Sequence, residues 1–247
     1  MARGYGQYCP LSLAAELLGG RWTILVVSRL LDGCTRFNDI HRGVPQMSPT
    51  LLSRRLDELE RAGLVQTRRS GRGKDYRLTQ AGRDLEPMIL QLAVWGAHWA
   101  RDMTDEDLDP AFLVWSMHLR MNVEAMPPGR TVIEFSFTGA PKECDRFWIV
   151  HRDGDVEMCV KDPGLDADVA VSSDLRLFVE AWRGLRDLRR EIGAGRIRVD
   201  GPPRLCRQLP DWLLLSQLAP YPRRRPGRER RLAQATARAT EREAARS

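Results

Sequence analysis

Basic and hydroxyl side chains are concentrated between residues 48 and 79, at spacings that suit contact with a polyanion. This span holds eight basic and four acidic residues. Lysine and arginine neutralise phosphates, and short polar or arginine side chains on one helix face reach base edges in the major groove. The pattern predicts double-stranded DNA as the partner. The residues expected to contact it are Ser48, Thr50, Ser53, Arg54, Arg61, Arg68, Arg69, Arg72 and Lys74.

The remaining reactive side chains predict neither a catalytic nor a metal site. The 5 cysteines include no Cys-x-x-Cys pair, and the 4 histidines have no metal-ligand spacing. His151 has the acidic neighbours Asp153 and Asp155, but all three fall on an expected hairpin, where solubility explains them. The pair Gly71-x-Gly73 lacks the third glycine and the following helix of a dinucleotide loop. We therefore expect no enzyme activity, no cofactor and no metal.

Charge divides the chain of 247 residues into three segments. Residues 1–103 carry 15 basic and 10 acidic side chains, residues 104–221 carry 15 and 20, and residues 222–247 carry 9 and 3. A hydrophobic fraction of 43% is enough for packed cores. We expect a basic domain over 1–103, an acidic domain over 104–221 and a disordered basic tail over 222–247. The tail would either strengthen DNA binding or only aid solubility.

Hydropathy argues against membrane insertion. The longest unbroken aliphatic run is Ile24 to Val27, whereas about 20 apolar residues are needed to cross a bilayer. The N-terminal sequence also lacks the pattern of a secretory signal. We expect a cytoplasmic protein.

The elements that carry the DNA-contacting residues follow from local signals. Ser48 is a strong N-cap and Pro49 suits the first helical position, so a helix is expected over 48–62. Its leucines would face the core and leave its polar residues exposed. Short extended runs on either side of the turn at 70–73 predict a β-hairpin. Earlier helices are expected over 11–18, 21–31 and 37–42.

A run of ordered motifs spans residues 9–79. These are Cys9-Pro10, Gly19-Gly20-Arg21-Trp22-Thr23, Arg36-Phe37-Asn38-Asp39-Ile40, Met47-Ser48-Pro49, Leu52, Arg55-Leu56, Leu59-Glu60, Gly63-Leu64-Val65 and Tyr76-Arg77-Leu78-Thr79, followed by Gly82. Together they resemble the HxlR-type branch of the MarR-like winged-helix transcription regulators. The resemblance implies a dimeric DNA-binding regulator with its recognition helix at 48–62 and its wing at 65–79. The wing loop departs from the family's usual proline- and valine-containing sequence.

Two further roles are implied by this resemblance. Cys9 matches the position of a redox-sensing thiol in some relatives, and the alternative is an inert thiol. The helix after Thr79 pairs two subunits in the family, and the alternative is that its apolar stripe packs on the chain's own second domain. The residues expected at the dimer interface are Leu85, Met88, Ile89, Leu92, Trp95 and Trp99.

The acidic segment alternates between helical and strand-like patterns. A helix over 111–123 is expected first, and further helices over 174–182 and 203–215. The strands between them alternate apolar and polar residues, which is typical of a small, mainly antiparallel sheet covered by helices on one side. The expected strands are 131–138, 146–152, 156–161, 167–172 and 196–200. The chain as a whole is thus expected to be of the α+β class.

The order of these elements, with the motifs Asp166-Ala167-Asp168-Val169 and Gly195-Arg196-Ile197-Arg198-Val199-Asp200-Gly201, resembles the sterol carrier protein type 2 fold. This resemblance implies an apolar tunnel that holds a hydrophobic small molecule. The residues considered for its lining, with plain core packing as the alternative, are Phe135, Phe137, Trp148, Phe178 and Trp182.

These observations favour a dimeric DNA-binding transcriptional regulator that a hydrophobic effector controls through the C-terminal domain. Two alternatives stay open. In one, the chain is a carrier of hydrophobic ligands and the winged helix serves mainly for dimerisation. In the other, Cys9 makes the chain a redox-sensing regulator.

Overall fold

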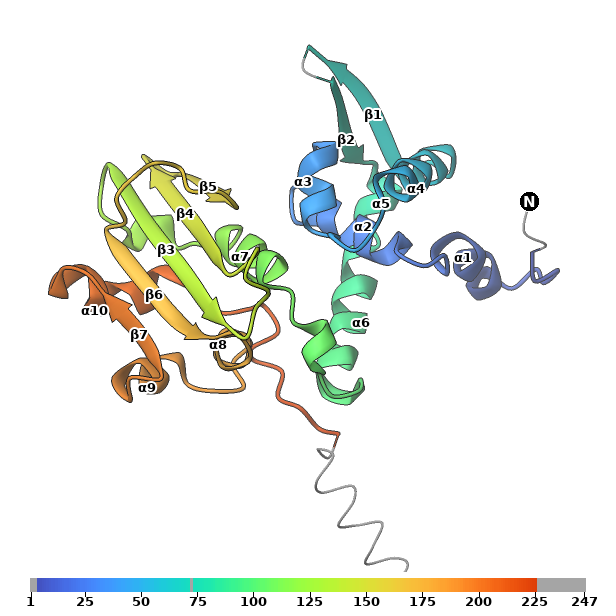
Figure 1. Cartoon of the computed structure of the whole chain (residues 1–247). Helices are drawn as coiled ribbons and strands as arrows, with labels where there is room; N and C mark the ends of the chain where they lie inside the picture. Colours follow the sequence, from blue (N-terminus) through green and yellow to red (C-terminus); the bar gives the residue numbers. More distant parts are fainter. Residues whose placement is uncertain (1–3, 72, 226–247) are drawn as a thin grey trace, which may run out of the picture.

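The computed structural model describes residues 4–71 and 73–225, which pack around two main hydrophobic cores (Figure 1). One core lies in an N-terminal module of helices and a β-hairpin, and the other lies in a C-terminal module built on a five-stranded sheet. The fold is therefore mixed α+β, as expected.

The N-terminal module has the element order of a winged helix. Helices α2, α3 and α4 pack together, and the hairpin β1–β2 follows α4 directly. Its leucine-rich core contains Leu52, Leu56 and Leu59, the leucines that were expected to face inward. The elements are α1 (Pro10–Leu18), α2 (Thr23–Leu31), α3 (Phe37–Arg42), α4 (Pro49–Arg61), β1 (Val65–Ser70), β2 (Gly73–Leu78), α5 (Gln80–Arg83) and α6 (Glu86–Trp99).

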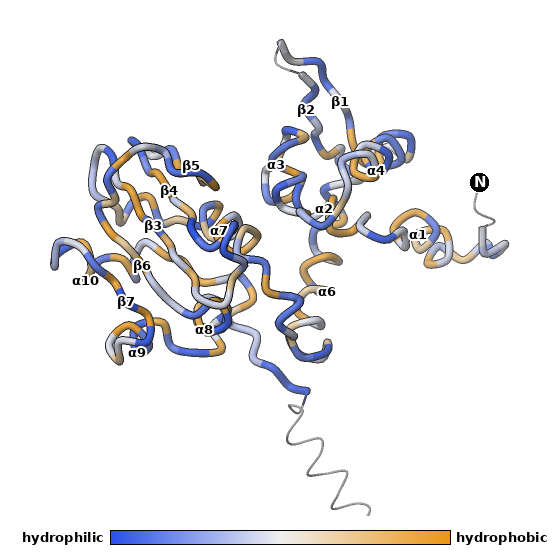
Figure 2. Tube along the Cα trace, viewed as in Figure 1, coloured by the Kyte–Doolittle hydropathy of each residue, from blue (hydrophilic) through white to orange (hydrophobic). Residues whose placement is uncertain are grey.

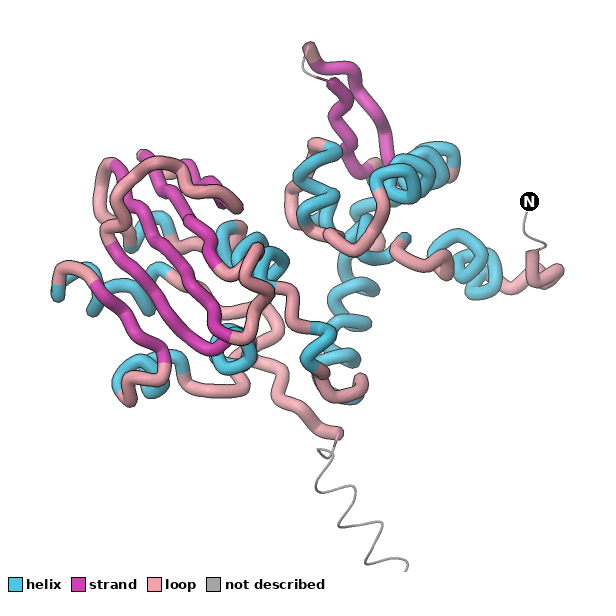
Figure 3. Tube along the Cα trace, viewed as in Figure 1, coloured by secondary structure: helices cyan, strands magenta, loops and turns pink. Residues whose placement is uncertain are grey.

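The C-terminal sheet is mainly antiparallel, with strand order β5-β4-β3-β6-β7 and only the central pair β3–β6 parallel among the described strands (Figure 3). The expected strands are present with shifted ends, and the helix expected over 111–123 ends earlier. The elements are η1 (Asp105–Asp107), α7 (Pro110–His118), η2 (Val123–Ala125), β3 (Arg130–Thr138), β4 (Arg146–Arg152), β5 (Asp155–Cys159), β6 (Val169–Asp174), α8 (Leu175–Trp182), α9 (Leu188–Gly193), β7 (Ile197–Asp200) and α10 (Pro203–Trp212).

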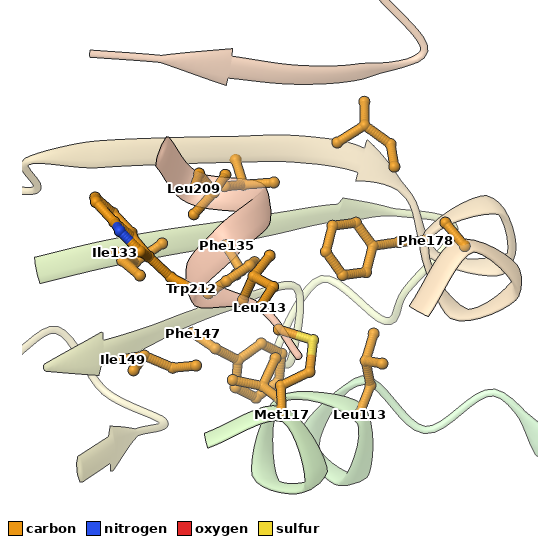
Figure 4. Close-up of a cluster of buried hydrophobic side chains, with 14 of the residues drawn as sticks. Leu113, Met117, Ile133, Phe135, Phe147, Ile149, Phe178, Leu209, Trp212 and Leu213 are labelled. Atoms are coloured by element: carbon orange, nitrogen blue, oxygen red, sulfur yellow. The ribbon is translucent and has the colours of Figure 1, made fainter. Parts of the chain in front are cut away.

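One face of this sheet forms the C-terminal core with helices α7, α8, α9 and α10 (Figure 4). Phe135 and Phe178 meet edge to face with ring centroids 5.9 Å apart, and Phe137 lies 5.5 Å from Phe178. Trp212 is fully buried and its indole Nε1 donates a hydrogen bond to the carbonyl of Ala125 at 3.0 Å. Alternation along the strands places a smaller cluster, which includes Trp148, on the opposite face.

Helix α7 belongs to the C-terminal module by sequence, but it also completes the N-terminal core. The Trp115 ring is 2% exposed and packs with the N-terminal cluster. The Arg29 guanidinium lies 5.0 Å from its centroid, and a Cβ at Gly43 would come within 2.6 Å of the indole. Glycine is therefore required at 43 for this approach, and the two modules share a packed joint.

Residues 222–225 return to α6. His98 donates through Nδ1 to the carbonyl of Pro222 at 2.6 Å, while the backbone amides of Arg224 and Arg225 donate to the His98 carbonyl. Arg223 pairs with Asp102 at 2.6 Å. The sequence-based expectation of disorder from 222 onward therefore differs from the structure over 222–225, because the amides of Arg224 and Arg225 satisfy the His98 carbonyl near the end of α6. The rest of the expected tail, 226–247, lies outside the described residues.

Within the described ranges, no single helix is long and apolar enough to cross a membrane, and only α1 and α2 taken together, at an angle of 84°, pass the length and composition test.

Candidate nucleic-acid interface

Ser48 and Pro49, from which the start of α4 was predicted, begin the helix in the structure. The Ser48 hydroxyl accepts a hydrogen bond from the Leu51 amide at 3.3 Å, and Pro49 occupies the first helical position. The cap satisfies an amide that the helix leaves unpaired. The Ser48 hydroxyl thus caps α4. Ser48 is also exposed, at the end of the helix that was expected to meet DNA.

Arg55 anchors α4 to the turn that precedes α2. Its Nε donates to the Arg21 carbonyl at 3.2 Å, and its side chain also pairs with Glu58. A Cβ at Gly20 would come within 3.2 Å of the Arg55 guanidinium, so the small residue leaves room for this contact. In the sequence Arg55 stands out only as part of a motif, because its contact with Arg21 joins positions that lie 34 residues apart.

The outward face of α4 presents Thr50, Ser53, Arg54 and Arg61, all of them exposed. Arg54 Nε lies 3.0 Å from Glu58, and 66% of the Arg54 side chain is exposed. Arg61 donates to the Asp57 carbonyl at 3.1 Å. The hydrogen bonds from Arg54 and Arg55 lower the pKa of Glu58 against the raising effect of its burial. This ionised carboxylate holds Arg54 along the helix.

The hairpin β1–β2 carries a second group of exposed cations, Arg68, Arg69, Lys74 and Arg77. Strand register pairs Arg69 with Lys74 and Arg68 with Asp75. Arg36 forms an ion pair with Asp75 at 3.0 Å, and the Tyr76 amide donates to the Thr35 carbonyl at 2.8 Å. The wing is thus tied to the segment before α3. Arg72, also expected to contact DNA, lies outside the described residues.

The hairpin and the far end of α6 lie at opposite ends of the N-terminal module, and α1 lies on the side away from the C-terminal module (Figure 1). Helices α1 and α6 both contain hydrophobic residues, which are orange in Figure 2. Among the expected dimer residues, Leu85 and Ile89 pack on the N-terminal core, whereas Met88, Leu92, Trp95 and Trp99 are 43%, 47%, 58% and 44% exposed. The stripe is therefore not covered by the second module, which was the alternative.

Cys9 is exposed at the N-terminal end of α1. Hydrogen bonding to the backbones of Ser12 and Leu11 lowers the pKa of its thiol. Cys34 differs, since burial raises its pKa to about 11. Of the two thiols, Cys9 has the properties of a reactive one.

Four of the five residues expected to line one hydrophobic pocket share the C-terminal core, and the fifth, Trp148, does not. Phe135, Phe137 and Phe178 fill the core against one another, and Trp182 packs at its edge. The prediction that Trp148 lines the same pocket is wrong. The strand register pairs Trp148 with Glu134, so its side chain points to the face opposite Phe135. Side chains alternate between the two faces of a sheet along each strand. Which residues of β3 and β4 share a face depends on the register between the strands, and this register does not follow from the pattern of either strand alone.

The geometry defines a winged helix that presents a polar, arginine-bearing helix and a cationic wing, the arrangement of a helix-turn-helix DNA-binding protein. Residues 17–104 match the family described as HxlR-like helix-turn-helix. The uncharacterized HTH-type transcriptional regulators YdeP and YvaP of Bacillus subtilis (strain 168) are each 33% identical to this chain. The YdeP alignment covers 40% of this chain and 78% of YdeP, and the YvaP alignment covers 43% and 95%.

A solved structure described as the redox regulator HypR in its reduced form is 33% identical, with a TM-score of 0.33, covering 36% of this chain and 90% of HypR. The chain belongs to the HxlR-like family of helix-turn-helix transcriptional regulators. It is accordingly a DNA-binding transcriptional regulator. The family match ends at residue 104, so the C-terminal sheet module lies beyond it.

Proposed function

We propose that this regulator binds a near-palindromic operator as a homodimer, with one α4 in the major groove of each half-site. The observation that carries the proposal is the exposed cationic face shared by α4 and the wing. In this proposal Thr50, Ser53 and Arg54 reach base edges, and the wing cations with Arg61 and Ser48 contact phosphates. Residues 1–103 form the DNA-binding and dimerisation domain, and 104–221 form the regulatory domain.

Helix α6 is the proposed dimer contact. Its exposed tryptophans and leucine follow one another at helical spacing, and contiguous exposed apolar surface marks an interaction site. Pairing two copies would bury these side chains and set two recognition helices about 34 Å apart, one turn of DNA. The apolar residues of α1, which include Leu11 at 77% exposure, would add to the same interface.

Hydroxyl-radical footprinting of DNA upstream of the gene tests this proposal. Two protected segments about 10 base pairs apart, related by a near-palindrome, are the expected result. A single protected segment would contradict the dimeric arrangement. Protection spread evenly over specific and scrambled DNA would contradict operator recognition altogether.

The exposed, low-pKa thiol of Cys9 supports a second function, control by oxidants. Oxidation of a thiolate gives a sulfenic acid that condenses with another thiol. In a dimer built through α1 and α6, modification of Cys9 would act on the subunit contact. Comparing operator affinity of the wild type and Cys9→Ser after treatment with diamide tests this function; equal loss in both would exclude Cys9 as the sensor.

We propose that the C-terminal module is a sterol carrier-like unit, supported by the order of its helices and its largely antiparallel sheet. Its phenylalanine core is already filled by mutual contacts, so a hydrophobic effector would have to displace those rings. Titration with the fluorescent fatty acid cis-parinaric acid tests a carrier role. Stoichiometric binding would support it, and no saturable signal would exclude it.

A further inference from the structure

An open groove of about 450 Å³ follows one edge of the C-terminal sheet. All four residues of β7, Ile197–Asp200, line it together with residues of α9 and α10. Successive side chains of a strand point to opposite faces of a sheet, so a groove that contacts four consecutive residues runs along the backbone edge. Among the described strands β7 pairs only with β6, and its other edge therefore presents amides and carbonyls that no strand satisfies.

The two edges of the sheet differ in what lies beside them. β5 is the other edge strand, and its Met158 packs with the N-terminal core. β7 lies on the side of the sheet away from the N-terminal module, beside α9 and α10 (Figure 1). Gly193 and Gly195 of the groove face open space, since a Cβ at either position would meet nothing within 4 Å. The β7 edge is therefore accessible independently of the DNA-binding module.

The helices beside β7 give the groove a positive charge. Arg189 of α9 and Arg207 of α10 both line it, and both are exposed. Arg189 pairs with Asp211 at 2.5 Å, but both side chains are largely in water, where such a pair contributes little. Arg207 has no ion pair within the described part of the chain. Residues 187–211 carry six basic and four acidic side chains, whereas the acidic segment 104–221 as a whole carries 15 and 20.

The carboxylate of the groove lining, Asp200, does not offset these helix arginines. Alternation along β7 places Asp200 on the face away from the helices, together with Arg198. Towards the helices the groove is mainly apolar, with the half-buried side chains Ile192, Val199, Cys206 and Pro210. A strand added beside β7 would direct every second side chain onto this apolar surface and its arginine rim.

We propose that the β7 edge binds an extended, acidic segment of a partner protein, which joins the sheet as a further strand. Main-chain hydrogen bonds to β7 supply affinity, and the two helix arginines favour acidic over basic segments. The proposal gives the C-terminal module a protein partner of its own. It depends on neither the operator, the proposed dimer nor a hydrophobic effector.

Two fluorescein-labelled probe peptides test the charge requirement, one alternating glutamate with valine and the other alternating lysine with valine, each about eight residues long. Anisotropy titration of the full chain should show saturable binding of the acidic peptide and binding of the basic peptide weaker by about tenfold or more. Arg207→Glu should weaken the acidic peptide by about tenfold. Arg204→Glu is the matched control, since it makes the same change on α10 outside the groove lining and should leave the affinity unchanged.

Two further measurements locate the peptide and separate strand pairing from charge attraction. Bound acidic peptide should slow hydrogen exchange of the β7 amides but not of the β5 amides. Gly193→Trp should block binding, because an indole placed in open space at this position fills the groove without displacing another group. An acidic peptide with proline in place of every valine lacks amides needed for strand pairing and should bind about tenfold more weakly.

Each measurement has an outcome that would overturn the proposal. These outcomes are no saturable binding of the acidic peptide, equal affinity for acidic and basic peptides, equal affinity for the valine and proline peptides, and unchanged exchange of the β7 amides at saturation. An effect of Arg204→Glu as large as that of Arg207→Glu, or undiminished binding by a folded Gly193→Trp variant, would equally overturn it. Circular dichroism of every variant shows whether it is folded.

Discussion

In the proposed DNA interface, side chains that are free to contact bases differ from side chains that hold the recognition helix in place. Arg54 is free to leave Glu58 because its side chain is two-thirds exposed. Ser48 and Arg55, by contrast, are committed to the geometry of α4 through a cap and a loop contact. We therefore expect Arg54 to affect sequence specificity, and Ser48 and Arg55 to affect the placement of α4.

Arg54→Ala should lower discrimination between operator and scrambled DNA by about 1 to 3 kcal/mol, since a base contact is lost. Arg69→Ala on the wing should weaken both duplexes alike and reduce the salt slope by about one, since a phosphate contact is lost. Affinities measured at several salt concentrations check both. Identical behaviour of the two variants would show that the division between reading and anchoring is wrong.

Cys9 should react faster with iodoacetamide than Cys34 at neutral pH. Hydrogen bonds lower the pKa of Cys9 and it is exposed, whereas the pKa of about 11 and the burial of Cys34 keep that thiol protonated and covered. Alkylation followed by mass spectrometry gives both rates. The Cys9 rate should fall as pH drops through its lowered pKa; a rate for Cys34 equal to that of Cys9 would refute this ranking.

Elements with local signals were predictable, and those set by distant contacts were not. Ser48 and Pro49 predicted the start of α4 because a cap and a first-turn proline act within a few residues. Trp115 lies within the helix expected over 111–123, yet it completes the other module's core. No pattern within one segment reports such a contact, and the same limit applies to the face of Trp148.

The joint between α3 and α7 gives a prediction at this scale. Gly43→Ala should destabilise the protein by about 1 to 3 kcal/mol, because the new Cβ overlaps Trp115 and Arg29 in a packed site. Gly193→Ala is the matched control, since it meets nothing within 4 Å and removes a helix glycine. Urea unfolding compares the two. Equal free energies of unfolding for the two variants would show that the contact between Gly43 and Trp115 adjusts to the new Cβ without loss of stability.

For the molecule as a whole, the proposed homodimer gives a prediction about the exposed stripe of α6. Trp95→Glu should convert the proposed dimer to a monomer, because it places a charge on the exposed stripe of α6. Leu185→Glu, at a similarly exposed hydrophobic residue of the other module, should leave the assembly unchanged. Sedimentation velocity distinguishes the species; a wild-type monomer, or a dimer in Trp95→Glu, would contradict the role of α6.

The central claim is that the winged helix recognises a specific DNA sequence. Fluorescence anisotropy with the chain's own upstream duplex and a scrambled duplex, over a range of salt, tests it most directly. The expected result is a preference of about 10³-fold or more for the native duplex that persists as salt rises. Equal affinities that fall together steeply with salt would contradict it and leave only nonspecific binding by a basic surface.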